Sequence, residues 1–181
     1  MPIDTRLTYE DYCLLPNDRK RYEIIDGELF VTPSPLWRHQ NVLTNLLLCL
    51  GEFVKKHDLG KVITAPLDVV FSQYDVVEPD ILYVSKARSF VVTEKNIQGA
   101  PDLVVEILSE GTAKIDRTTK LKLYARYGVA EYWVIDPETC SAEIYRLVPG
   151  GYELAAKLDS TQSLTSPLFS GFTLALSRLA E

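Results

Sequence analysis

The sequence predicts an α/β protein in which one mixed β-sheet is flanked by helices. Two apolar runs at residues 102–108 and 131–136 enclose an amphipathic stretch at 113–127, and this order with short connections is typical of a crossover unit. Apolar runs on both sides of Asp26-Gly27 indicate a hairpin. The chain has 181 residues, 46% of them hydrophobic and 24% charged, which suits one domain spanning 1–181 and excludes a mainly disordered chain.

The N-terminal part is expected to hold a short helix and then the hairpin. The helix begins after Thr8, and the hairpin pairs residues 21–25 with residues 28–31. Asp26-Gly27 is expected to form the turn, because glycine tolerates a positive φ.

A long helix is expected after the hairpin. Ser34 is a suitable N-cap and Pro35 a suitable first helical residue, and the apolar stripe that includes His39 continues to about His57. The next segments are predicted to be strands at 61–71 with a bend at Pro66, at 78–84 and at 102–108, with a polar loop or small helix at 85–99.

The remainder of the chain alternates helix and strand. The helix at 113–127 is expected to stop at Gly128, since glycine favours the left-handed conformation that ends many helices. Residues 131–136 follow as a strand. The tail is expected to add a hairpin around 149–151 and a weak strand or helix at 164–179.

Composition excludes several classes of protein. The most apolar stretch, 43–50, is far shorter than the ~20 residues of a membrane span, and the first residues contain no apolar signal region. The three cysteines are odd in number and widely separated, which predicts reduced thiols and a cytoplasmic location. The net charge of −6 argues against broad, non-specific coating of nucleic acid, although it leaves room for a local basic cleft.

Two carboxylates lie on predicted strand faces that are otherwise apolar. Alternation places Asp80 on the face of Leu82, and it places Glu106 on the face of Val104. A buried, unpaired carboxylate is costly, so each must be protonated, hydrogen-bonded or bound to a cation. Neighbouring strands lie about 4.8 Å apart, so two such groups in register can share one divalent ion. The alternative is that either carboxylate caps a loop or pairs with an arginine.

One lysine on the following helix is expected to face the sheet. At about 100° per residue, Lys120 shares its face with Asp116, whereas Lys122 points almost the opposite way. A lysine on a packed face needs an anionic partner, and Glu106 or a bound phosphate suits it. The alternatives are a pair with Asp116 or a side chain that reaches past its neighbours to water. The same segment is rich in basic residues and is a candidate phosphate-facing patch, formed by Lys114, Arg117, Lys120, Lys122 and Arg126.

These residues resemble a known pattern. Pro79-Asp80, followed after 25 residues by Glu106 within Asp-Leu-Val-Val-Glu-Ile-Leu-Ser, resembles the PD-(D/E)xK nuclease superfamily. Over about residues 20–160 the chain is similar, more specifically, to a bacterial restriction-endonuclease-like family formerly classed as a domain of unknown function. The residues that carry this second similarity are Arg21 to Glu28, His39, Asp116, Lys120, Tyr124 and Gly128 to Trp133.

The resemblance implies a restriction-endonuclease-like fold and a metal site. Asp80 and Glu106 would bind Mg²⁺ or Mn²⁺, and Lys120 would be the catalytic lysine. The superfamily normally places this lysine two residues after the acid, where this chain has Leu108. The resemblance therefore implies that the lysine has moved to the helix, in agreement with the face that periodicity assigns to it.

Further residues enter the site by the same resemblance. Glu23 would be an additional catalytic acid from the first hairpin, and the alternative is a solvated charge on that hairpin. His39 would support the site, and the alternative is a histidine at the edge of the core. Asp116 would also have a supporting role.

The expected function is Mg²⁺-dependent hydrolysis of phosphodiester bonds in DNA by a homodimer, with Lys114, Arg117 and Lys122 in contact with the nucleic acid. The rival interpretation is a non-catalytic nucleic-acid-binding or protein-interaction module that keeps the nuclease fold. An enzyme acting on small molecules has little support, because the sequence has no glycine-rich phosphate loop and no nucleophile motif.

Overall fold

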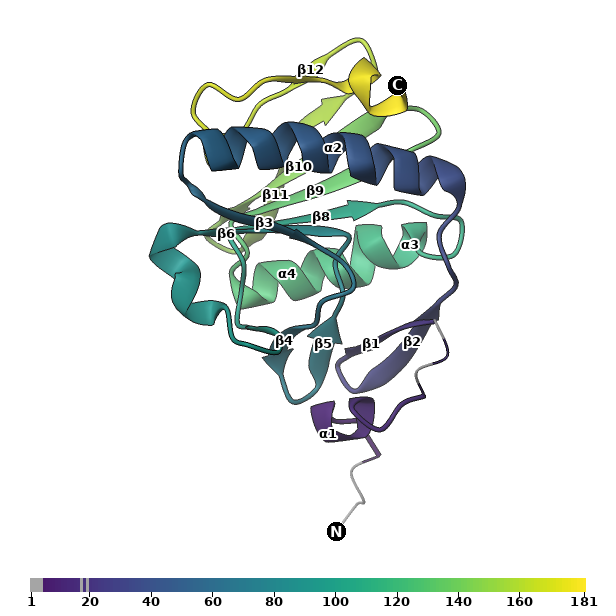
Figure 1. Cartoon of the computed structure of the whole chain (residues 1–181). Helices are drawn as coiled ribbons and strands as arrows, with labels where there is room; N and C mark the ends of the chain where they lie inside the picture. The colour runs from purple at the N-terminus through teal and green to yellow at the C-terminus, as the bar shows by residue number, and fades with distance from the viewer. Residues whose placement is uncertain (1–4, 17, 19) are drawn as a thin grey trace.

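The structure is a computed structural model that describes residues 5–16, 18 and 20–181 (Figure 1). Residues 1–4, part of the N-terminus in which no signal region is expected, lie outside the described residues. The helices are α1 (Tyr9–Tyr12), α2 (Trp37–Lys56), α3 (Ala113–Ile115) and α4 (Leu121–Tyr127). Shorter helical turns are η1 (Lys86–Val91), η2 (Asp116–Lys120) and η3 (Leu176–Ala180).

The strands of the described residues form three sheets. The six-stranded sheet has the order β11 (Gly151–Leu158), β10 (Ser141–Val148), β9 (Glu131–Asp136), β8 (Leu103–Ile107), β6 (Ile81–Ser85) and β3 (Gly60–Thr64). The five-stranded sheet has the order β2 (Glu28–Thr32), β1 (Arg21–Ile25), β5 (Asp75–Val77), β4 (Val69–Ser72) and β7 (Ile97–Gln98). The third sheet pairs β12 (Ser163–Leu164) with β13 (Leu174–Ala175). The α/β class with mixed sheets flanked by helices is confirmed, although the strands divide among several sheets rather than forming one.

The division between the two larger sheets occurs at Pro66. The strand expected at 61–71 ends as β3 at Thr64, and the chain passes through a cis Ala65–Pro66 bond before β4 begins in the other sheet. Proline has no N–H to donate to a sheet ladder, so a continuous strand through this position is disfavoured.

Helices cover both faces of the six-stranded sheet (Figure 1). On one face α2 packs Leu46 and Leu50 against Val105 of β8, and on the other face α4 packs Tyr124 against Val104. In the sequence, β8 precedes the α3–α4 segment and β9 follows it. The two strands pair in parallel, which confirms the crossover unit. Among the described residues, no helix combines the length and the apolar sequence that crossing a bilayer requires.

The hairpin β1–β2 is confirmed, and it matters because it delivers two charged residues to the site. Asp26 and Gly27 both have positive φ, 54° and 80°, as a tight turn between twisted strands requires. Ile24 pairs with Val76, so the hairpin joins the five-stranded sheet through β5. The short helix after Thr8 is also confirmed, and a reciprocal hydrogen-bond pair between Thr8 and Asp11 caps it.

Two helix predictions differ from the structure. Helix α2 begins at Trp37 rather than after Ser34, because the chain remains extended through its N-cap Leu36 and residues 32–36 line a cavity. The predicted helix at 113–127 is divided by η2, a π-helical turn, although it ends at Gly128 in the left-handed conformation as expected. The wider π turn brings Asp116 and Lys120 inward together, and both are buried.

Candidate active site

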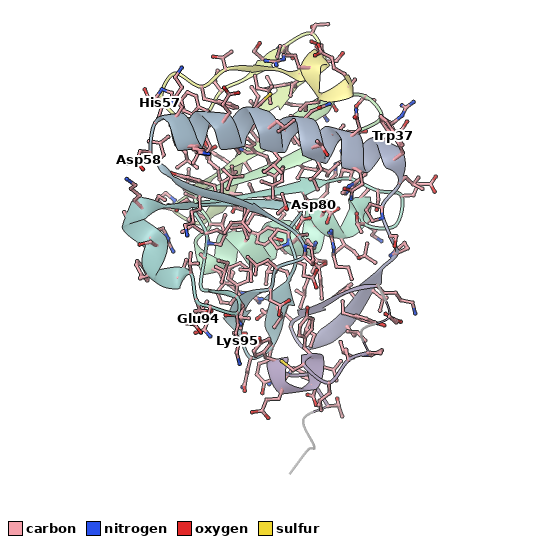
Figure 2. All side chains as sticks on the ribbon, viewed as in Figure 1. Trp37, His57, Asp58, Asp80, Glu94 and Lys95 are labelled. Carbon is pink, nitrogen blue, oxygen red and sulfur yellow. The ribbon has the colours of Figure 1, made fainter. Side chains whose placement is uncertain are left out.

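The alternation pattern predicted that Asp80 lies within a strand, but Asp80 lies just before β6. It is 1% exposed and lies in the interior below α2 (Figure 2). Its Oδ1 accepts a hydrogen bond from Nη1 of Arg21 at 2.8 Å, and its Oδ2 accepts from the Ile107 main-chain N–H at 2.8 Å. The Nε2 of His39 lies 3.1 Å from Oδ2. The carboxylate is therefore held by donors from three different elements.

The pKa of Asp80 reflects these donors. Burial alone raises the pKa of a carboxyl group, but the hydrogen bond from His39 and the positive charge of Arg21 outweigh it here. The result is a pKa lowered to about 2, so Asp80 is ionised at neutral pH. The alternative that Asp80 pairs with an arginine describes this arrangement, and it does not exclude a role as a metal ligand.

Glu106 lies opposite Asp80 on the neighbouring strand. Because Ile81 pairs with Val105 in the antiparallel ladder of β6 and β8, the residues on either side of that pair, Asp80 and Glu106, face each other. Oε1 of Glu106 accepts from Nζ of Lys120 at 3.0 Å and from the Tyr124 hydroxyl at 2.6 Å. Burial raises the pKa of Glu106 to about 8, and although Lys120 opposes this shift, neighbouring carboxylates add to it.

Lys120 is the fixed cation of the site. Its Nζ lies 2.9 Å from Glu23, 3.0 Å from Glu106 and 3.6 Å from Asp116. Burial lowers the pKa of a lysine, but these three carboxylates more than compensate and raise the pKa of Lys120 above its ordinary value. Lys120 is 2% exposed, so it does not reach past its neighbours to water; Lys122, by contrast, is exposed.

Glu23 is buried rather than solvated, at 2% exposure. Its Oε1 accepts from Nζ of Lys120 at 2.9 Å and from the main-chain N–H of Glu78 at 3.0 Å. Glu23 is not part of the cavity wall that the other charged residues form, so it lies behind Lys120 and holds that ammonium in place.

Asp116 and His39 each have a buried atom without a hydrogen-bond partner among the described residues. These atoms are Oδ1 of Asp116 and Nδ1 of His39, and both residues line the cavity next to Asp80. The pKa of Asp116 is raised, first by burial and then by neighbouring carboxylates. Oδ1 of Asp116 lies 3.6 Å from Nζ of Lys120 but accepts no hydrogen bond among the described residues, so it is available as a ligand for a cation.

These side chains meet at one cavity of about 340 Å³. The charged residues and the histidine in its wall are Arg21, His39, Asp80, Glu106, Glu110, Asp116 and Lys120. The rest of the wall comes from Ile107 and from the uncharged residues of the loops at 32–36 and 109–112. The cavity is large enough for a phosphate group and opens between the first hairpin, the start of α2 and the loop that follows β8.

The basic residues that were expected to contact nucleic acid do not gather at this cavity. Arg117 lines a neighbouring cavity of about 390 Å³ that shares His39 and residues 109–110 with the first, and it lies 3.4 Å from Glu143. Lys122 lines a different cavity beside Gly150, and Lys114 is exposed. Of these three residues, Arg117 alone lies next to the cavity that contains Asp80 and Glu106. The nucleic-acid contacts of all three stay predictions.

The donor set is suitable for a hard divalent cation, although no group of three or more His, Cys, Asp or Glu among the described residues is arranged as a ready metal cage. Asp80, Glu106 and Asp116 present carboxylate oxygens to one cavity, and such oxygens are the ligands that Mg²⁺ and Mn²⁺ prefer. Together with Glu23 they can carry four negative charges against the two fixed positive charges of Arg21 and Lys120. A divalent ion would balance this excess.

Sequence reasoning assigned no role to two residues of the site. Arg21 contacts Asp80, and Tyr124 contacts Glu106. Periodicity could have indicated both, because each shares a face with a predicted site residue. Arg21 is two residues before Glu23 on one strand face, and Tyr124 is one helical turn after Lys120. Neither pattern indicates the partner, which comes from a distant part of the chain.

Comparison with known proteins identifies the family of the chain. The model of the Uma2 family, described as "Putative restriction endonuclease", matches residues 9–177. The chain belongs to the Uma2 family. Among solved structures, a "putative nuclease belonging to DUF820" from Anabaena variabilis ATCC 29413 matches this Uma2 chain with a TM-score of 0.79 and 22% identity, covering 98% of this chain and 97% of that one. This likeness shows that the two chains share a fold, and the family match confirms that the fold is nuclease-like. No curated protein matches.

Proposed function

We propose that this Uma2-family protein is a metal-dependent endonuclease that hydrolyses phosphodiester bonds in DNA. One observation carries the proposal: Asp80, just before β6, and Glu106, on the adjacent strand β8, line one cavity, with Nζ of Lys120 3.0 Å from Glu106. Two acids and a lysine around a phosphate-sized cavity supply the metal ligands and the fixed positive charge that phosphodiester hydrolysis needs.

Each residue has a role that its contacts support. Asp80, Glu106 and Asp116 would hold Mg²⁺ or Mn²⁺, and the bound ion would polarise the phosphate and lower the pKa of its water. Lys120 supplies a fixed charge that stabilises the negative charge developing on the phosphate oxygens. Because Glu23 holds the Lys120 ammonium, that charge is in place before the substrate binds.

The same proposal includes a homodimer, because two copies related by a twofold axis can cut both strands of a duplex. The protein as a whole is acidic, with a net charge of −6, so DNA would have to approach the cavity through local basic groups such as Arg117.

The test is a plasmid-nicking assay with purified protein in Mg²⁺ and in Mn²⁺. Asp80→Asn and Glu106→Gln are expected to lose nicking activity by on the order of 100-fold or more, since each removes a charged ligand with little change in shape. Glu153→Gln, which changes an exposed glutamate on β11, is the control and should nick like the wild type. Nicking that survives in both site variants would refute the assignment of the site.

A second candidate function has one observation in its favour. Both oxygens of Asp80 are already occupied by protein donors, as expected for a nuclease fold that only binds nucleic acid or a protein. If the wild type binds DNA or a protein partner but cuts neither DNA nor RNA with any divalent ion, this non-catalytic function replaces the first.

A further inference from the structure

The two carboxylate oxygens of Asp80 differ in how firmly they are held. Oδ2 accepts a hydrogen bond from the main-chain N–H of Ile107, which is part of β8, and another from His39, which is in the first turn of α2. Within the described part of the chain, Oδ1 accepts only from Nη1 of Arg21, at 2.8 Å. Oδ1 is therefore the oxygen that a cation can reach without breaking a main-chain hydrogen bond.

Arg21 is held more loosely than the other cation of the site. Among the residues that the structure describes, its one short contact is with Asp80, and its Nε lies 4.0 Å from Glu78. Both side chains line the cavity, but that of Arg21 is 20% exposed, whereas that of Lys120 is 3% exposed and contacts three carboxylates. The Arg21 guanidinium therefore has fewer contacts to break than the Lys120 ammonium before it can move within the cavity.

We infer that Arg21 occupies the metal-facing oxygen of Asp80 until a divalent cation replaces it, and that the released guanidinium then binds the phosphodiester. This inference rests on the proposed function. Arg21 and a divalent ion cannot both lie against Oδ1, because like charges a few ångströms apart repel strongly. Once displaced, the guanidinium lies in a cavity that receives the phosphate, and its planar donors match phosphate oxygens.

The experiment measures two affinities of the full-length protein, with Arg21→Gln compared with the wild type. The first is the affinity for Mn²⁺ alone, by calorimetry or by the spin resonance of free Mn²⁺. Arg21→Gln should bind Mn²⁺ more tightly, on the order of tenfold, because its competitor is gone. The second is the affinity for a labelled DNA duplex in Ca²⁺, which should be weaker by on the order of tenfold. If the substitution merely disrupted the site, the affinity for Mn²⁺ and the affinity for DNA would both be weaker.

Two controls locate the effect. Lys20→Gln removes one positive charge from the adjacent exposed residue and should leave Mn²⁺ affinity unchanged. Asp80→Asn should abolish the same Mn²⁺ binding with either residue at position 21. If binding depends on Asp80 but Arg21→Gln binds Mn²⁺ no more tightly than the wild type, the competition is refuted and the proposed function stands. If no Mn²⁺ binding depends on Asp80, both are refuted.

A measurement on the wild type avoids dependence on the folding of Arg21→Gln. The side-chain Nε–H resonance of Arg21, assigned by its loss in Arg21→Lys, should shift when Mg²⁺ is added. A resonance that stays unchanged while Mg²⁺ binds at Asp80 would overturn the inference.

Discussion

Replacing Lys120 by methionine is expected to abolish nicking and to lower the free energy of unfolding by about 3–5 kcal/mol. The Lys120 ammonium contacts Glu23, Glu106 and Asp116, and its removal leaves these carboxylates buried without a compensating charge. Denaturant unfolding measures the loss of stability, and a nicking assay well below the unfolding midpoint measures the activity of the folded variant.

Two comparisons separate the stability effect from the catalytic effect. Lys122→Met, on the exposed face of the same helix, should change the free energy of unfolding by less than about 0.5 kcal/mol. The double variant Lys120→Met/Glu23→Gln should regain part of the lost stability, because it removes one of the buried carboxylates that has lost its lysine, but no activity. Equal losses of stability in the Lys120 and Lys122 variants would contradict the buried cluster.

The stability of the metal-free protein is expected to fall between about pH 5 and pH 8 relative to that of Glu106→Gln. The pKa of Glu106 is raised from 4.5 to about 8 in the folded protein, so the folded state retains a proton that the unfolded state has lost. The contribution of Glu106 to stability is therefore complete below pH 4.5 and is lost as the pH rises through 8. Because one proton is involved, the free energy of unfolding should fall by about 1.4 kcal/mol per pH unit over this window, relative to that of Glu106→Gln.

Denaturant titrations of both proteins at each pH measure this difference. The sign is opposite for Asp80, whose pKa is lowered to about 2, since its contribution is present above pH 3.8 and is lost as the pH falls through 2. Because a metal binds the ionised carboxylate, Mn²⁺ should stabilise the wild type more at pH 8 than at pH 6. A difference between wild type and Glu106→Gln that stays flat or rises from pH 5 to pH 8 would contradict the raised pKa.

Local patterns in the sequence predicted the parts of the fold that depend on neighbouring residues. The Asp26-Gly27 turn, the crossover between β8 and β9 and the inward face of Lys120 all follow from periodicity or turn chemistry, and the structure confirms them. The π turn from Asp116 to Lys120 did not follow from a uniform 100° rotation. The split of the sheet at Pro66 also depends on packing between distant strands.

The sequence indicated most of the charged residues that meet at the candidate site, but not Arg21 or Tyr124 and not the contacts between them. Alternation placed Asp80 and Glu106 each on an otherwise apolar strand face, but it could not show that Asp80 lies just before β6 and bonds Arg21, which is 59 residues away. Likewise, nothing local to Glu23 indicates that its partner is Lys120, 97 residues further along the chain. Such pairs are set by the tertiary fold.

The proposed function depends on one claim, that Asp80 and Glu106 together bind a divalent cation. The most direct test is a crystal structure of the protein soaked in Mn²⁺, with anomalous scattering to locate the ion. The predicted result is an ion bound by carboxylate oxygens of both residues inside the cavity. Density for Mn²⁺ elsewhere, or none between these two carboxylates at a concentration that supports nicking, would contradict the claim.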